Sequence, residues 1–314
     1  MDYELCENFN TVIEEYPDEL NNSDGNRFYR ISGIDAYCFD EGSGKPECKT
    51  ELDKINALCL WFLNENIAYR IKDLSKEKIN VFIIYIMIWL NYMLNLKKDD
   101  KTNLNNLYTK HIEKDANYTK CKRHSKDCNS TLKENTGYNN FKEIMVERKD
   151  LLNINYEDIS KFYEAFKLLC KIPTENDEDN LECTKYLEYA NDIVEKFKKL
   201  NENSSATGNT SYNQVWSTLS TDYDSFKNKY NGINCMNIPS LPSIKTTQHH
   251  VQSSDVTSSS FSIVKKLILA LSIFSAITIF LGIFYKCSLF VLRKRDKKQH
   301  LREKLKNIKK RMNH

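Results

Sequence analysis

Apolar side chains recur every three to four positions along most of the chain up to Tyr230, which predicts a series of amphipathic helices. We did not find the strict apolar and polar alternation that is typical of a half-buried strand. The pattern therefore predicts an all-α domain. The predicted helices are Asp2–Leu20, Leu52–Ala68, Ser75–Leu96, Lys101–Glu113, Tyr138–Leu152, Tyr156–Ile172, Leu181–Leu200 and Tyr212–Tyr230.

The most apolar of these helices is Ser75–Leu96, whose first residue is a plausible N-cap. Its ten consecutive uncharged residues Val81–Leu90 are too few to cross a bilayer, and Asn91 interrupts the run that follows. Apolar residues form two stripes along this helix, so we expect neighbours on more than one side. We predict that it is the central core helix, with Trp89 buried.

A second apolar run, Leu267–Tyr285, contains no charge. As a helix it would be ~28 Å long, close to the hydrocarbon thickness of a bilayer. From Lys286 to His314 there are 12 Lys and Arg against two acidic residues, which by the positive-inside rule predicts a cytosolic C-terminus. We interpret this run as a single transmembrane helix rather than as a buried helix of a soluble domain.

The net charge of the segment before the predicted span differs in sign from that of the whole chain. The whole chain has a net charge of +3, whereas residues 1–264 carry about −9. The basic tail favours anionic lipid headgroups or a cytosolic partner over nucleic acid. The first ten residues lack the basic and apolar regions of a cleavable signal peptide, so we expect the span to serve as the targeting element.

Ten cysteines are present, and nine of them precede the predicted span. In an acidic, translocated segment this number indicates disulfides formed in an oxidising compartment. Because nine is odd, at least one is free or pairs between chains. We expect the polar loops Asn21–Thr50 and Ala116–Gly137 to be pinned by disulfides to helices. Cys287, at the cytosolic edge of the span, is expected to be a free thiol or palmitoylated. Eight cysteines allow 105 pairings, and the sequence selects none.

Other candidate chemistry is sparse. Cys121, His124 and Cys128 have a spacing that offers three zinc ligands, but a structural site needs four and the setting favours disulfides. We find no catalytic motif, phosphate loop or dinucleotide fingerprint, and so expect no catalytic, metal or cofactor site. Five Asn-x-Ser/Thr sequons mark expected surface sites. They begin at Asn21, Asn117, Asn129, Asn203 and Asn209.

Together these patterns predict four regions. We expect a disulfide-stapled helical ectodomain at residues 1–236 and a disordered Ser/Thr/Pro stalk at residues 237–264. A transmembrane helix at residues 265–286 and a short basic cytosolic tail at residues 287–314 follow.

Three stretches resemble the Plasmodium interspersed repeat (PIR) proteins of malaria parasites, most closely the rodent-parasite branch. They are INALCLWFLNENI with INVFIIYIMIWLNYMLNL, then DISKFYEAFKLLCKIPTE, and the span with its tail VLRKRDKKQHLREKLK. The resemblance implies a variant surface antigen with a helical, cysteine-containing ectodomain and no signal peptide. It also implies that Cys128 is the extra thiol beside an even set. That disulfide set is Cys6, Cys38, Cys48, Cys59, Cys121, Cys170, Cys183 and Cys235.

The resemblance implies export into or onto the infected red cell. We expect a single-pass membrane adhesion, host-interaction or immune-evasion module without catalysis, whose partners are the lipid bilayer and a host surface protein. The alternative is a structural or trafficking component of exported parasite membranes, with the basic tail bound to a cytosolic partner. Access of an external protease to the ectodomain distinguishes the two.

Overall fold

The computed structural model describes residues 1–19, 27–38, 47–98, 102–123, 126–174, 183–202, 209–231, 235 and 237–244. All of them belong to one compact unit, Met1–Gln248. The predicted span, the basic tail with Cys287 and most of the predicted stalk lie outside the described residues. The domain boundaries within that part therefore stay predictions.

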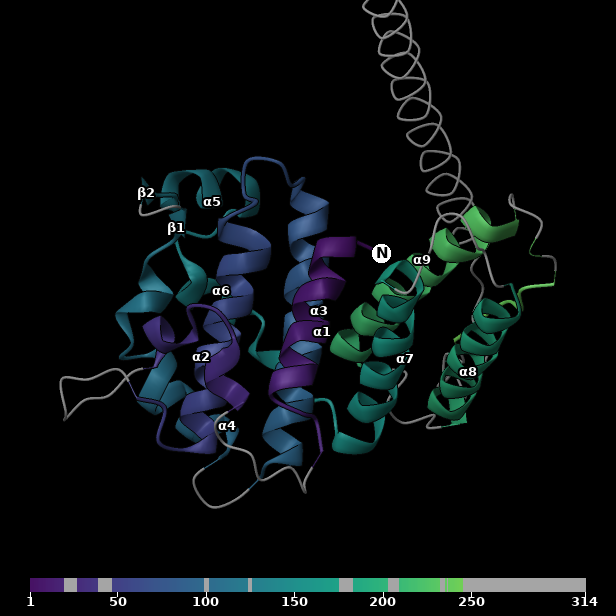
Figure 1. Ribbon diagram of the computed structural model, residues 1–314, viewed down its shortest axis with the longest axis horizontal. Helices are drawn as coiled ribbons and strands as arrows, with labels where there is room; N and C mark the ends of the chain where they lie inside the picture. Colours follow the sequence, from purple (N-terminus) through teal and green to yellow (C-terminus); the bar gives the residue numbers. More distant parts are fainter. Residues whose placement is uncertain are drawn as a thin grey trace, which may run out of the picture. The chain divides into compact units, whose positions relative to one another are not determined.

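The described part of the chain is mostly helical (Figure 1). The α-helices are α1 Tyr3–Glu15, α2 Glu51–Leu63, α3 Lys76–Leu96, α4 Leu104–Asn106, α5 Asn129–Thr136, α6 Phe141–Glu147, α7 Tyr156–Thr174, α8 Cys183–Glu202 and α9 Thr210–Asn231. π-Helical segments Asn64–Ala68 and Leu107–Ile112 continue α2 and α4. The 3₁₀ segments are Arg27–Arg30, Ile34–Tyr37, Ala116–Thr119 and Lys149–Asn153.

Helix α3 lies in the core. It contacts α2, α5, α7, α9 and the 3₁₀ segment Lys149–Asn153, and Trp89 is 1% exposed. The side chain of Ser75 caps the helix by accepting a hydrogen bond from the backbone N–H of Lys78 at 3.2 Å. Among the described helices, α3 alone has the length and apolar composition to cross a membrane, but most of it is buried within the domain. It is the core helix that the sequence predicts.

Helices α1 and α7 pack against this centre through aromatic side chains. The ring of Phe9 on α1 lies 4.2 Å from that of Phe62 on α2 and 4.7 Å from that of Phe166 on α7, between centroids. Phe166 in turn stacks on Tyr85 of α3 at 4.5 Å. Since aromatic pairs add to the free energy of burial, this cluster joins four helices into one core.

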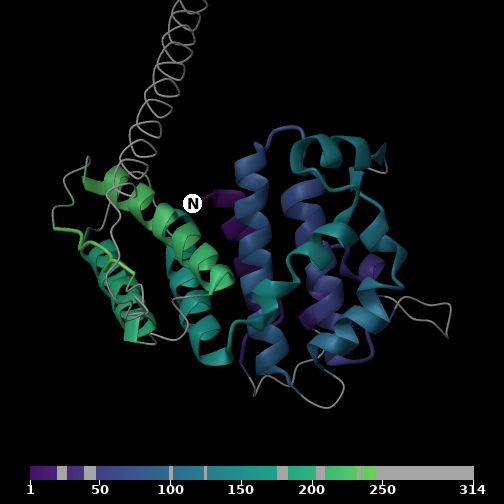
Figure 2. The ribbon, with the colours of Figure 1, turned by 180° about the vertical axis from the view of Figure 1, so that it is seen from behind.

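Helices α7, α8 and α9 form a second group, which Figure 2 shows from behind. Phe197 of α8 meets Trp216 of α9 edge to face, with ring centroids 4.6 Å apart. Trp216 is 6% exposed, so it is buried as well, at the edge of the core rather than at its centre.

The structure differs from the predicted boundary of the stalk. Residues 237–244 lie against the helical domain: Ile238 is buried, the Tyr223 hydroxyl donates to the carbonyl of Pro239 at 2.7 Å, and the Asn201 amide donates to the carbonyl of Ser243 at 2.7 Å. This segment contains Pro and Ser, and its overall composition therefore predicts disorder. It also contains apolar residues such as Ile238, which are buried against the helical domain.

One short hairpin departs from the all-α prediction. Strands β1 Lys122–Arg123 and β2 Lys126–Asp127 pair antiparallel, with Lys122 opposite Asp127 and Arg123 opposite Lys126. Two residues per strand are too few to produce an alternating pattern in the sequence. The prediction of helices throughout is therefore correct for the core and incomplete at the surface.

Candidate functional site

Four disulfides hold the described part of the chain, and they fall into two kinds. Two join cysteines that are distant in the sequence, and two join cysteines that are only 10 and 7 residues apart. The pairs are Cys6–Cys170, Cys183–Cys235, Cys38–Cys48 and Cys121–Cys128.

The structure corrects two of the cysteine assignments. Cys128, expected to be the extra thiol, is bonded to Cys121, and Cys59, expected in a disulfide, is free and fully buried. Cys59 lies in the middle of α2, on a face buried in the core. At such a position a cysteine behaves as a small apolar side chain. Burial raises the pKa of the Cys59 thiol to about 12, so it is not a thiolate nucleophile.

The structure also corrects the expected connection of the polar loops. Each loop is closed on itself, over sequence separations of 10 and 7 residues, rather than pinned to a distant helix. Cysteines this close in sequence meet wherever the chain turns back on itself, with Cα atoms here 4.9 and 5.0 Å apart. The helices are instead joined to each other through Cys6 on α1 and Cys170 on α7.

Hydrogen bonds hold the described residues of the loop Cys121–Cys128 in a defined conformation. The backbone N–H of Cys128 donates to the carbonyl of Cys121 at 3.0 Å. The side chain of Asn129 accepts from the backbone N–H of Cys121 at 2.6 Å and donates to the carbonyl of Thr119 at 3.1 Å. Arg123 Nε donates to the carbonyl of Tyr69 at 2.8 Å and so ties the hairpin to the end of the α2 π-helical segment. The hairpin is therefore fixed on both sides.

The zinc alternative does not fit this geometry. Because Cys121 and Cys128 are bonded to each other, neither offers a thiolate to a metal ion. His124 lies outside the described residues. Within the described ranges, no three His, Cys, Asp or Glu side chains gather as metal ligands.

The closest arrangement to a catalytic pair is His111 with Asp53. Their Nε2 and Oδ1 atoms are 3.3 Å apart, and the His111 side chain is 4% exposed. Burial acts to raise the pKa of the Asp53 carboxyl, but the contact with His111 and the hydrogen bond from the backbone N–H of Thr50 outweigh burial and hold that pKa below its ordinary value. Asp53 also completes the capping box that begins α2. The pair therefore joins the start of α2 to the π-helical segment Leu107–Ile112.

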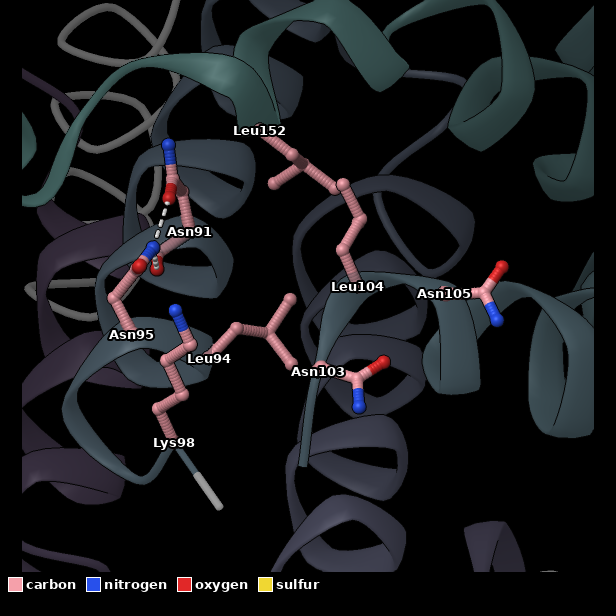
Figure 3. A pocket seen from close by; sticks show the side chains of 8 residues that line it. All are labelled: Asn91, Leu94, Asn95, Lys98, Asn103, Leu104, Asn105 and Leu152. Atoms are coloured by element: carbon pink, nitrogen blue, oxygen red, sulfur yellow. Dashed lines mark hydrogen bonds between the residues drawn. The ribbon is translucent and has the colours of Figure 1, made fainter. Parts of the chain in front are cut away.

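A pocket of about 330 Å³ lies between the end of α3, the start of α4 and the 3₁₀ segment Lys149–Asn153 (Figure 3). The Asn91 amide donates to the carbonyls of Leu151 and Ile154, at 3.0 Å each, and accepts from Asn95 at 2.7 Å. The Asn91 amide thus fastens the 3₁₀ segment to α3, and both its nitrogen and its oxygen are engaged within the domain. The pocket is lined by Asn91, Leu94, Asn95, Lys98, Asn103, Leu104, Asn105 and Leu152.

The sequons differ in how far the fold engages their asparagines. The amide of Asn129 is held in the hairpin, and Asn209 accepts from the backbone of Ser211 at the start of α9. Asn117 is half-exposed, whereas Asn21 and Asn203 lie outside the described residues. The sequence already marks Cys121–Cys128 as a basic loop, but sequence reasoning assigned no binding role to its Lys and Arg residues.

Comparisons with known proteins place the chain among parasite antigens. A family model described as Plasmodium variant antigen protein Cir/Yir/Bir matches residues 6–286. The solved structure of a Plasmodium PIR protein ectodomain is 28% identical, with a TM-score of 0.56, and the match covers 78% of this chain and 98% of that chain. No curated protein sequence matches the chain.

Proposed function

Because this chain belongs to the Plasmodium Cir/Yir/Bir family of variant antigens, we propose that it is a membrane-anchored surface antigen whose ectodomain binds host molecules. The observation that carries the proposal is the match over residues 6–286, which extends from the first cysteine through the predicted span. The family is described as one of variant antigens. The chain then acts through recognition, without catalysis.

The arrangement of the ectodomain supports recognition. A buried helical core is held by the Cys6–Cys170 bond, while the loops Cys38–Cys48 and Cys121–Cys128 are each closed at their base. Loops at the surface of a rigid scaffold accept changes in sequence without loss of the fold. A variant antigen needs this separation, because exposed residues change while the core is retained.

The sequence beyond the described residues supplies the anchor of the proposal. Leu267–Tyr285 spans the bilayer once, and the tail from Cys287 onward lies in the cytosol, against anionic lipids or a cytosolic partner. The partners of the ectodomain in this proposal are host surface proteins or other host surface molecules. The alternative function, a structural or trafficking component of exported membranes, needs only the span and the tail.

Protease treatment of intact infected red cells tests the proposal. With an epitope tag at each end of the chain, external protease is expected to remove the N-terminal tag and to leave the C-terminal tag. A cytosolic parasite protein serves as the control for intact membranes. Survival of the N-terminal tag in intact cells, with loss after permeabilisation, would contradict surface exposure and favour the alternative.

A further inference from the structure

His111 is a buried histidine that recognition at the surface does not use. Its side chain is 4% exposed and lies in the π-helical segment Leu107–Ile112. π-Helical turns are rare and occur frequently at functional sites. The Nε2 atom of His111 is 3.3 Å from Asp53 Oδ1, whereas its Nδ1 atom is buried without a hydrogen-bond partner among the described residues. A buried polar nitrogen of this kind requires an explanation.

A second carboxylate, that of Asp115, follows His111 by four residues. The backbone N–H of Asp115 donates to the His111 carbonyl at 2.7 Å, and residues four apart in such a turn share one face. Asp115 is 2% exposed. Burial holds the pKa of its carboxyl above the ordinary value, although hydrogen bonds and the charge of His111 oppose this. His111 therefore interacts with two carboxylates, one on α2 and one in its own segment.

Other titratable groups on the neighbouring elements do not replace this pairing. On α2, Glu51 and Lys54 pair with each other at 2.9 Å. The buried Cys59 thiol and Tyr118 hydroxyl stay uncharged, because burial raises their pKa values. Helix α4 carries no titratable side chain. The charged side chains nearer the surface are Lys110, Glu113, Lys114 and Lys142.

The charge of His111 changes the electrostatic free energy of this cluster. With a neutral imidazole, the carboxylates of Asp53 and Asp115 lack a cation in a site that is poor in water, which is costly. With an imidazolium, both carboxylates are compensated, and both ring nitrogens are donors. Histidine is the side chain that ordinarily changes charge between about pH 5 and pH 8. Proton uptake in this range therefore favours the conformation in which His111 lies against α2.

We propose that His111 is a proton-dependent latch, which in its charged form fastens residues 107–119 to α2 and which releases them as the pH rises above neutral. Asp53 belongs to the capping box that begins α2, so the latch holds the segment to a fixed helix start. The His111 carbonyl accepts hydrogen bonds from the backbone N–H groups of Lys114 and Asp115, at 3.0 and 2.7 Å. Release of His111 thus loosens the turn that follows it.

The structural alternative is a neutral His111 whose Nε2–H donates to Asp53 at every pH. Both interpretations join the segment to α2 in mild acid, but only the latch weakens this connection as the pH rises. Glutamine at position 111 separates them, because its amide N–H can still donate to Asp53 while it carries no charge.

Urea denaturation of residues 1–248, which form one compact unit, tests the latch between pH 8 and pH 5. The variant is His111→Gln, and the matched control is His124→Gln, which changes the other histidine of this unit. The ratio of the folding equilibrium constants, unchanged domain over His111→Gln, should rise at least about tenfold from pH 8 to pH 5, since the folded state binds the proton more tightly. His124→Gln should follow the unchanged domain at each pH. A ratio for His111→Gln that stays constant with pH would overturn the proposal.

Hydrogen exchange on the unchanged domain keeps the test decisive if His111→Gln does not fold. Protection factors correct for the intrinsic pH dependence of exchange. At the backbone amides of Lys114 and Asp115 they are expected to fall between pH 6 and pH 8, while those of α3 stay constant. Asp115→Asn removes one carboxylate with little change of shape, and the fall at residue 114 should then be smaller. Constant protection at both amides, or an undiminished fall in Asp115→Asn, contradicts the latch.

Discussion

The Cys6–Cys170 bond and the Cys121–Cys128 bond use the same chemistry for different purposes. The first joins α1 to α7 across a sequence separation of 164 residues, whereas the second joins cysteines that are only 7 residues apart in one hairpin. The cysteines of both bonds are buried. A long closed loop restricts the unfolded chain far more than a short one does. The first bond therefore stabilises the domain, and the second fixes the shape of one small surface.

The difference separates where the fold is determined from where recognition can vary. Around Cys6 and Cys170 the neighbours are buried aromatic rings such as Phe9 and Phe166, where a change of volume is costly. Next to Cys121 and Cys128 in the sequence lie exposed lysines, where a change of side chain leaves the core intact.

The largest expected effect is the loss of the Cys6–Cys170 bond. Cys6→Ala/Cys170→Ala is expected to lower the free energy of unfolding by about 5 kcal/mol, from the chain entropy of a loop of this length. Urea denaturation of the ectodomain measures the change. The matched control, Cys38→Ala/Cys48→Ala, closes only 10 residues and should cost about 3 kcal/mol. Equal losses for the two pairs would contradict the distinction drawn here.

The second prediction concerns the centre of the core. Trp89→Ala should cost about 3–5 kcal/mol, as for other large buried aromatic side chains. Trp216→Ala should cost less, because Trp216 lies at the edge of the core and is slightly more exposed. Thermal unfolding of both variants tests the ranking, and a larger shift for Trp216→Ala would reverse our placement of the centre.

The third prediction concerns the hairpin closed by Cys121–Cys128. Cys121→Ser/Cys128→Ser should lower the free energy of unfolding by about 2 kcal/mol, because the closed loop is short. Hydrogen exchange should increase at the backbone amide of residue 128, which donates to the carbonyl of residue 121, while α3 keeps its protection. Loss of protection throughout α3 would show that this bond supports the core after all.

Much of the helical core can be predicted from the sequence. The spacing of apolar residues predicts α3, its N-cap at Ser75 and its burial, and the family assigned from three sequence stretches is confirmed by the family match. The pairing of the cysteines could not be predicted from the sequence, because it depends on distances that helix packing sets. The free thiol carried a signal nonetheless: Cys59 lies among apolar residues in mid-helix, whereas Cys128 follows Cys121 closely in a polar loop.

Helix α5 shows where the pattern is insufficient. Its eight residues bury Leu132 and Thr136, so no apolar period marks it. It is defined instead by its ends, with the Cys121–Cys128 bond before it and Gly137 after it. Gly137 adopts φ 86°, a left-handed conformation that favours glycine, and its N–H donates to the carbonyl of Lys133 at 2.8 Å. The region around α5 is thus the one that apolar periodicity describes least.

The smallest expected effect concerns Asp2, which joins α1 to the segment after α2 without a covalent bond. Its carboxylate caps α1 through Leu5 and accepts two hydrogen bonds from Arg70, at 2.8 and 2.9 Å. Burial raises the pKa of Asp2, but the hydrogen bonds and the charge of Arg70 outweigh burial and lower it below the ordinary 3.8. Asp2→Ala should cost about 1–2 kcal/mol at neutral pH, chiefly through loss of the cap.

The sign of the pH dependence follows from that lowered pKa. The ionised carboxylate stabilises the fold fully at pH values above 3.8, and this contribution is lost as the pH falls through the lower pKa of the folded state. The difference in the free energy of unfolding between the unchanged domain and Asp2→Asn should therefore shrink below pH 4. Urea titrations between pH 7 and pH 3 measure it. A difference that stays constant over this range would mean that Asp2 acts through packing alone, and the contact between α1 and Arg70 would then not depend on charge.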